Sequence, residues 1–62
     1  MYILVRPIIA SGTPLPDLFD GRDYDEPWVF LNYEVAVDWC DFARQVYPEI
    51  THFDMTTARS IA

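Results

Sequence analysis

The sequence contains no lysine, one cysteine and one histidine, and each scarcity excludes a class of function. Four arginines against ten acidic residues give a formal charge of -6. The chain therefore lacks the clustered cations that direct binding to nucleic acid or to an anionic membrane surface requires. One Cys cannot form an internal disulfide, and one Cys with one His cannot complete a zinc site. Without lysine there is also no P-loop.

Long apolar runs are missing as well. No segment approaches the roughly 20 apolar residues of a membrane-spanning helix. The apolar start, Met1 to Val5, lacks a cationic region and is followed at once by Arg6 and Pro7, so it does not read as a signal peptide. Together with a free cysteine, this pattern predicts a cytoplasmic protein.

Apolar and aromatic residues are abundant. They make up 52% and 16% of the chain, far more than in disordered acidic segments. We therefore expect a single small acidic domain over residues 1–62. A domain of this size buries only about 60% of its unfolded surface. We thus expect either an unusually aromatic core or burial contributed by a second chain.

Three segments have the composition of strands: 2–9, 28–31 and 51–57. Pro7 cannot donate a hydrogen bond, which predicts an edge position or the end of the first strand. In the third segment Phe53 and Met55 alternate with His52 and Asp54, as in a half-buried strand.

A helix is predicted over 33–47, with Asn32 as the N-cap and Pro48 as the stop. Its apolar residues form two adjacent rows that we expect to make one broad buried face. The rows are Val35, Trp39, Phe42 and Val46, and Ala36, Cys40, Ala43 and Tyr47.

A long loop rich in Pro, Gly and Asp spans 11–27, with a turn signal at Asp20–Asp23. We expect Leu15, Leu18 and Phe19 to fix this loop to the core. The element order then predicts an α+β fold, with one helix packed on a small, mostly antiparallel three-stranded sheet. The order along the chain is strand, strand, helix, strand.

Two patterns invite a catalytic or metal-binding interpretation. Cys40 and His52 could form a nucleophile and base, but a lone mid-helix Cys is far more typical of a buried core residue. The loop acids fail the calcium-loop template, because Gly21 as its sixth residue would put Pro16 first. We therefore predict no enzyme activity, no cofactor and no metal site.

The acidic residues offer the strongest candidate site. Helix acids recur at one-turn spacing on the side opposite the apolar rows, and more acids follow in the loop, giving a surface of one sign that attracts basic partners. A solubilising surface is the alternative interpretation. The candidate partner-binding residues are Glu34, Asp38, Asp41, Asp20, Asp23, Asp25 and Glu26.

Three functions follow from these features. The favoured one is a non-catalytic protein-binding domain that blocks a basic, nucleic-acid-binding surface of a larger protein. In size, charge and plan the chain resembles small phage-encoded inhibitors, including anti-CRISPR proteins and DNA mimics, which implies action in the host cytoplasm. The alternative is an assembly subunit that forms a homodimer through sheet edges and exposed aromatics. The third is a small enzyme built on Cys40 and His52.

Overall fold

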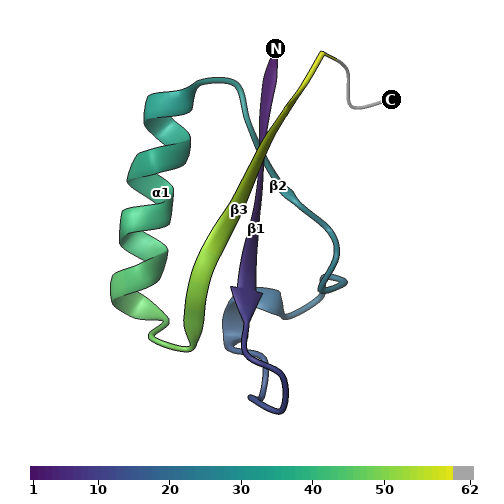
Figure 1. Ribbon diagram of the computed structural model, residues 1–62, viewed down its shortest axis with the longest axis vertical. Helices are drawn as coiled ribbons and strands as arrows, with labels where there is room; N and C mark the ends of the chain where they lie inside the picture. The colour runs from purple at the N-terminus through teal and green to yellow at the C-terminus, as the bar shows by residue number, and fades with distance from the viewer. Residues whose placement is uncertain (60–62) are drawn as a thin grey trace.

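The computed structural model describes residues 1–59 and contains one helix, three strands and a short 3-10 helix (Figure 1). The predicted α+β order of strand, strand, helix, strand is confirmed. The elements are β1 (Tyr2–Ile9), η1 (Asp17–Phe19), β2 (Trp28–Phe30), α1 (Tyr33–Val46) and β3 (Ile50–Ala58).

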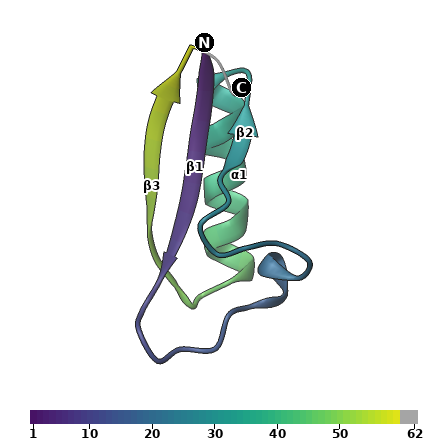
Figure 2. The ribbon, with the colours of Figure 1, turned by 90° about the vertical axis from the view of Figure 1, so that its right-hand side faces the viewer.

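The strand order is β2-β1-β3, and both pairings are antiparallel. The first strand therefore lies in the centre of the sheet, with β2 and β3 on its two sides (Figure 2). β3 pairs with β1 along its full length, with a register shift between Ile8 and Ile9. β2 pairs only with Ile3 to Val5. The sheet thus has one short edge and one long edge.

Pro7 lies in β1, in the part of the strand that the short strand β2 does not cover. The expected edge position is wrong for β1 as a whole, because β1 is central and continues to Ile9. Pro7 nevertheless lies beyond Val5, the last residue of β1 that pairs with β2. A missing N–H at this point costs no sheet hydrogen bond on that side. Beyond it, the Ile9 N–H donates to the Tyr24 hydroxyl at 3.0 Å.

Asn32 caps α1 as predicted. Its side-chain oxygen accepts hydrogen bonds from the backbone N–H groups of Glu34 at 2.7 Å and Val35 at 3.3 Å. These bonds satisfy two of the amides that have no partner within the helix. The cap fixes where α1 begins. The negative charge of Glu34 in the first turn interacts favourably with the positive end of the helix dipole.

The helix packs on one face of the sheet through its smaller residues. Ala36, Cys40 and Ala43 are buried, and Trp39 is half-buried. The expectation of one broad buried face is therefore wrong in part, because Phe42 is 56% exposed. The opposing sheet face carries bulky side chains, so the small row of α1 fits against it and the larger row turns to the flank. Val35 and Val46 are exposed with Phe42.

Aromatic rings join the helix, the sheet and the loop. The Trp39 ring lies 5.2 Å from Trp28 and 5.5 Å from Phe30, both on β2, and 6.0 Å from Phe53 on β3. Edge and tilted contacts of this kind stabilise a core beyond the area they bury. Among the described residues, Phe19 is the one aromatic ring that is fully part of the buried core, and the other rings pack against that core half-buried.

The long loop is attached to this core mainly by one ring. Phe19 is 4% exposed and contacts Tyr24 and Trp28 at centroid distances of 5.4 and 5.5 Å. Leu18 is half-buried against the same cluster, but Leu15 is 51% exposed, so the expectation that it fixes the loop is wrong. Ala58 extends β3 by one residue past the predicted end, and residues 60–62 lie outside the described part of the chain.

Candidate functional site

The three helix acids lie on the solvent side of α1. Glu34, Asp38 and Asp41 are all exposed, whereas the residues that contact the sheet occupy the other side of the helix. Four-residue spacing stacks Glu34 and Asp38 about one turn apart, roughly 5–6 Å between their Cβ atoms. The backbone that carries them is held by the Asn32 cap on one end and by the buried small row beneath.

Asp41 differs from the other two acids. Its carboxylate lies 3.8 Å from the Arg44 guanidinium, and both side chains are 61% exposed. An exposed pair of this kind contributes little to stability, but it lowers the negative potential at its own position. Glu34 and Asp38 form no ion pair within the described residues 1–59. Among the described residues, the two acidic side chains of α1 that form no ion pair therefore both lie in its N-terminal half.

A shallow hollow of about 290 Å³ lies in that half of α1. It is lined by Tyr33, Glu34, Val37 and Asp38. Glu34 and Asp38 are four residues apart, and so are Tyr33 and Val37. The two carboxylates therefore lie beside an aromatic ring and an aliphatic side chain. Sequence reasoning missed Tyr33 and Val37, although this spacing next to Glu34 and Asp38 could have identified them.

An apolar stripe runs along the flank of the same helix. Val35, Phe42 and Val46 are each at least half exposed, and Leu31, just before the N-cap, is 78% exposed. Exposed apolar side chains grouped on one helix, with charged residues beside them, are typical of protein-binding surfaces. The acidic side chains and the apolar stripe together cover the outer surface of α1.

The loop acids form a second, separate group. Asp20, Asp23, Asp25 and Glu26 are exposed in the segment between η1 and β2. In Figure 1 this segment bulges to the right of the strands, whereas α1 lies to their left. The structure thus does not bring the loop acids next to those of α1.

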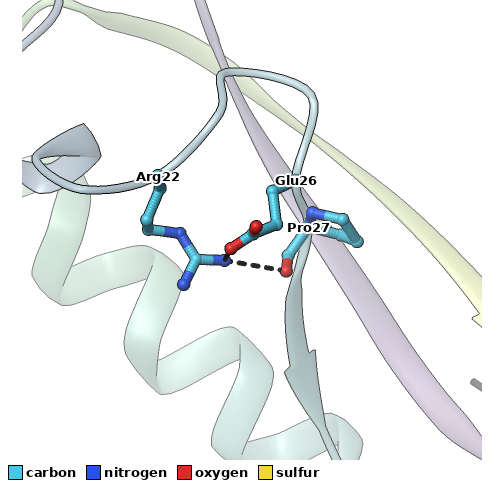
Figure 3. A network of polar contacts seen from close by, with 3 residues as sticks. All are labelled: Arg22, Glu26 and Pro27. Atoms are coloured by element: carbon cyan, nitrogen blue, oxygen red, sulfur yellow. Dashed lines mark hydrogen bonds and ion pairs between the residues drawn. The ribbon is translucent and has the colours of Figure 1, made fainter.

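Arg22 organises this loop. Its guanidinium is 3.1 Å from the Glu26 carboxylate and donates to the Pro27 carbonyl at 3.0 Å (Figure 3). It also lies over the Trp28 ring, 4.0 Å from the centroid. Glu26 is therefore partly neutralised within the chain, and the arginine connects the loop to the start of β2.

Cys40 and His52 line one groove, of about 370 Å³, between α1 and β3. Burial raises the pKa of the Cys40 thiol, Arg44 lowers it and Asp41 raises it, with burial the largest effect. The thiol is therefore protonated at neutral pH and is a poor nucleophile. The His52 Nδ1 lies 3.0 Å from the Thr51 hydroxyl, which itself donates to the Ile8 carbonyl. No Cys40–His52 hydrogen bond is found within residues 1–59.

Across residues 1–59 no three His, Cys, Asp or Glu side chains are grouped so that they could hold a metal ion. In the same part of the chain no helix has the length and apolar character needed to cross a membrane.

Comparisons with known proteins give no relative. No protein-family model matches the chain, and no curated protein or solved structure shows significant similarity to it. The assignment of function therefore depends on the geometry of the site alone.

Proposed function

We propose that the chain is a non-catalytic protein-binding domain whose outer α1 surface occupies a basic surface of a larger protein. The observation that supports this most is the hollow on α1, where Glu34 and Asp38 stand beside Tyr33 and Val37 and form no ion pair with any of the described residues 1–59. These four residues define the α1 hollow.

An arginine side chain fits the chemistry of the α1 hollow. Its guanidinium can donate to both carboxylates while its planar face lies against the Tyr33 ring. Its aliphatic stem finds an apolar neighbour in Val37. A lysine would satisfy the carboxylates as a point charge but would gain less from the ring.

The apolar stripe gives this contact the area that charges alone do not supply. Acidic groups accelerate encounter with a basic surface, whereas buried apolar and aromatic groups carry most of the binding energy. Phe42 is the largest side chain of the stripe. We therefore assign it as the anchor, with Glu34 and Asp38 orienting the partner.

A partner that binds nucleic acid presents such a surface. Its arginines and lysines are spaced to meet successive phosphates, and carboxylates about one helical turn apart can occupy them instead. Under this proposal the domain acts as a phage-type inhibitor, such as an anti-CRISPR protein or another inhibitor of host defence. It would act by excluding nucleic acid from the partner.

Two matched charge reversals test the proposal. A partner captured from host lysate is titrated with the wild-type chain, with Asp38→Lys and with Asp54→Lys. The last variant makes the same charge change on β3. We expect Asp38→Lys to raise the Kd by more than about tenfold and Asp54→Lys to leave it nearly unchanged. Circular dichroism checks that both variants fold.

Salt and competition complete the test. The affinity of the wild-type chain is expected to fall as ionic strength rises, because exposed charges carry the encounter. The chain is also expected to displace nucleic acid from the partner. Equal effects of the two reversals, or an affinity that ignores both, would remove α1 from the contact.

A further inference from the structure

The outer edge of β3 is open for pairing. β3 spans nine residues and, within the described chain, is hydrogen bonded to β1 alone. The other edge of the sheet is the three-residue strand β2. In Figure 2 β3 lies at one side of the sheet, with β1 and β2 on its other side. An unpaired edge of this length is a template for another strand.

The hydrogen bonds of β1 show which groups of β3 face outward. The Ile8 carbonyl accepts from Thr51 on β3, whereas the Ile9 N–H points the other way, to Tyr24. Since successive residues of a strand point their backbone groups to opposite sides, Arg6 also faces β3, where its register partner is Asp54. The backbone N–H and C=O groups of Phe53 and Met55 therefore point to the free edge.

This edge lacks the usual protection against strand addition. Proteins block exposed edges with lysine, proline, inward charges or bulges. Between Ile50 and Ala58 there is no lysine or proline, and Asp54 is the single acidic residue. The register shift lies at the start of the strand, opposite Ile8 and Ile9. In a chain with a charge of -6, β3 is close to neutral.

We propose that the β3 edge binds the β3 edge of a second copy, so that two antiparallel strands join the sheets into one of six strands. Charge selects the register. With Phe53 on the two-fold axis, Asp54 lies opposite the partner's His52, and both are exposed on one face of the sheet. An alignment with Asp54 on the axis would place two carboxylates face to face, which is unfavourable.

The same register covers apolar surface on the helix side. Phe53 and Met55 are half-buried and line the groove between α1 and β3. The two Phe53 rings of the dimer would be direct cross-strand neighbours, an arrangement that favours pairing. The dimer does not involve the α1 hollow, so the proposed dimer and the proposed partner binding can be tested independently.

Amide exchange of the unmodified chain tests the dimer without any substitution. Sedimentation equilibrium from micromolar to millimolar concentration is expected to show a mass that rises to twice that of the chain. Over the same range, the amides of Phe53 and Met55 are expected to become protected. Those of Asp54 and Thr56, which pair with β1, are expected to be protected throughout. Added salt is expected to strengthen the dimer by screening the net repulsion.

A charge reversal adds a second measurement. Asp54→Lys removes the carboxylate opposite the partner's His52 and places a lysine on the edge strand, so it is expected to raise the dimer Kd by roughly tenfold. Asp38→Lys on α1 makes the same change in net charge away from the edge and is expected not to raise the dimer Kd. Thermal unfolding checks that both variants fold, because Asp54 is also the register partner of Arg6. A monomer at all concentrations overturns the proposal. So does a dimer in which the Phe53 and Met55 amides still exchange freely.

Discussion

The indole rings of Trp28 and Trp39 lie 5.2 Å apart at 31°, and this contact joins β2 to the middle of α1. Trp28 also meets Phe19 edge-on, so the same pair connects the helix to the long loop. Trp39 packs against both buried clusters of the core. A domain of this length has a free energy of unfolding of about 3–9 kcal/mol, so one such contact carries a large share of it.

Trp39→Ala is therefore expected to lower the free energy of unfolding by about 3 kcal/mol, through lost burial and the cavity left among the rings. Phe42→Ala on the same helix is the matched control, since Phe42 is 56% exposed and its loss is expected to cost less than about 1 kcal/mol. Urea denaturation followed by circular dichroism measures both. Similar losses for the two variants would contradict the assignment of the core to the Trp39 side of α1.

Arg22 offers a test of how the loop is held. Arg22→Ala removes the contact with Trp28, the bond to Pro27 and the pair with Glu26, and is expected to cost about 1 kcal/mol. Glu26→Ala removes only the ion pair and is expected to cost a few tenths of that. Thermal unfolding compares them, and tryptophan fluorescence reports a change around the Trp28–Trp39 pair. A larger effect from Glu26 than from Arg22 would show that the ion pair, and not the ring contact, holds the loop.

The N-cap of α1 can be tested by two substitutions at one position. Asn32→Ala removes the oxygen that accepts from Glu34 and Val35, and is expected to lower the free energy of unfolding by about 1 kcal/mol. Asn32→Asp keeps an acceptor and is expected to be nearly neutral. Guanidinium denaturation gives both values. If Asn32→Asp is as damaging as Asn32→Ala, the side-chain cap is not what stabilises the start of the helix.

Local signals in the sequence were enough to predict the helix and the three strands, but not η1, which lies in the predicted loop. Asn32 and Pro48 mark the two ends of the helix, and the alternation around Phe53 identifies the third strand. Each of these features depends on residues a few positions apart, where capping and strand geometry act directly. The element order then restricts the fold to a helix on one face of a small sheet.

The central position of β1 could not be predicted. It depends on the path of the loop from Ala10 to Pro27, and in particular on Phe19 inserting into the core and Arg22 lying over Trp28. These are tertiary contacts with no local pattern. The same limit applies to the candidate site. Residue spacing predicted where the acids of α1 lie, but it could not predict where the loop acids lie relative to them.

The extent of the buried face of α1 was predicted only in part, for a different reason. Two adjacent apolar rows were visible, and hydrophobicity gives more weight to Phe42 and Val35 than to Ala36 and Ala43. The row that is buried is decided by the surface it meets. Here the sheet supplies the large side chains, among them Trp28 and Phe53, so the small row of the helix faces it. The periodicity of apolar residues shows which arc of a helix is apolar, but it does not show which part of that arc faces the core.

Cys40 gives a prediction about pH. Burial raises the pKa of its thiol above the ordinary value of 9.0, so the folded chain holds the proton more tightly than the unfolded chain does. The stability that this contributes is fully present below the unfolded-state pKa and is lost as pH rises through the higher folded-state pKa. Wild-type chain is therefore expected to lose stability relative to Cys40→Ala above about pH 9. Tyrosine ionisation, common to both chains, cancels in the comparison.

The reactivity of the same thiol provides the independent check. At neutral pH we expect iodoacetamide to modify Cys40 much more slowly in the folded chain than in urea, because the thiol is both buried and protonated. The rate in the folded chain is expected to keep rising at pH values where that of the unfolded chain has levelled off. Rapid modification of the folded chain near pH 7 would instead indicate an activated thiolate, and with it a catalytic role for the groove shared with His52.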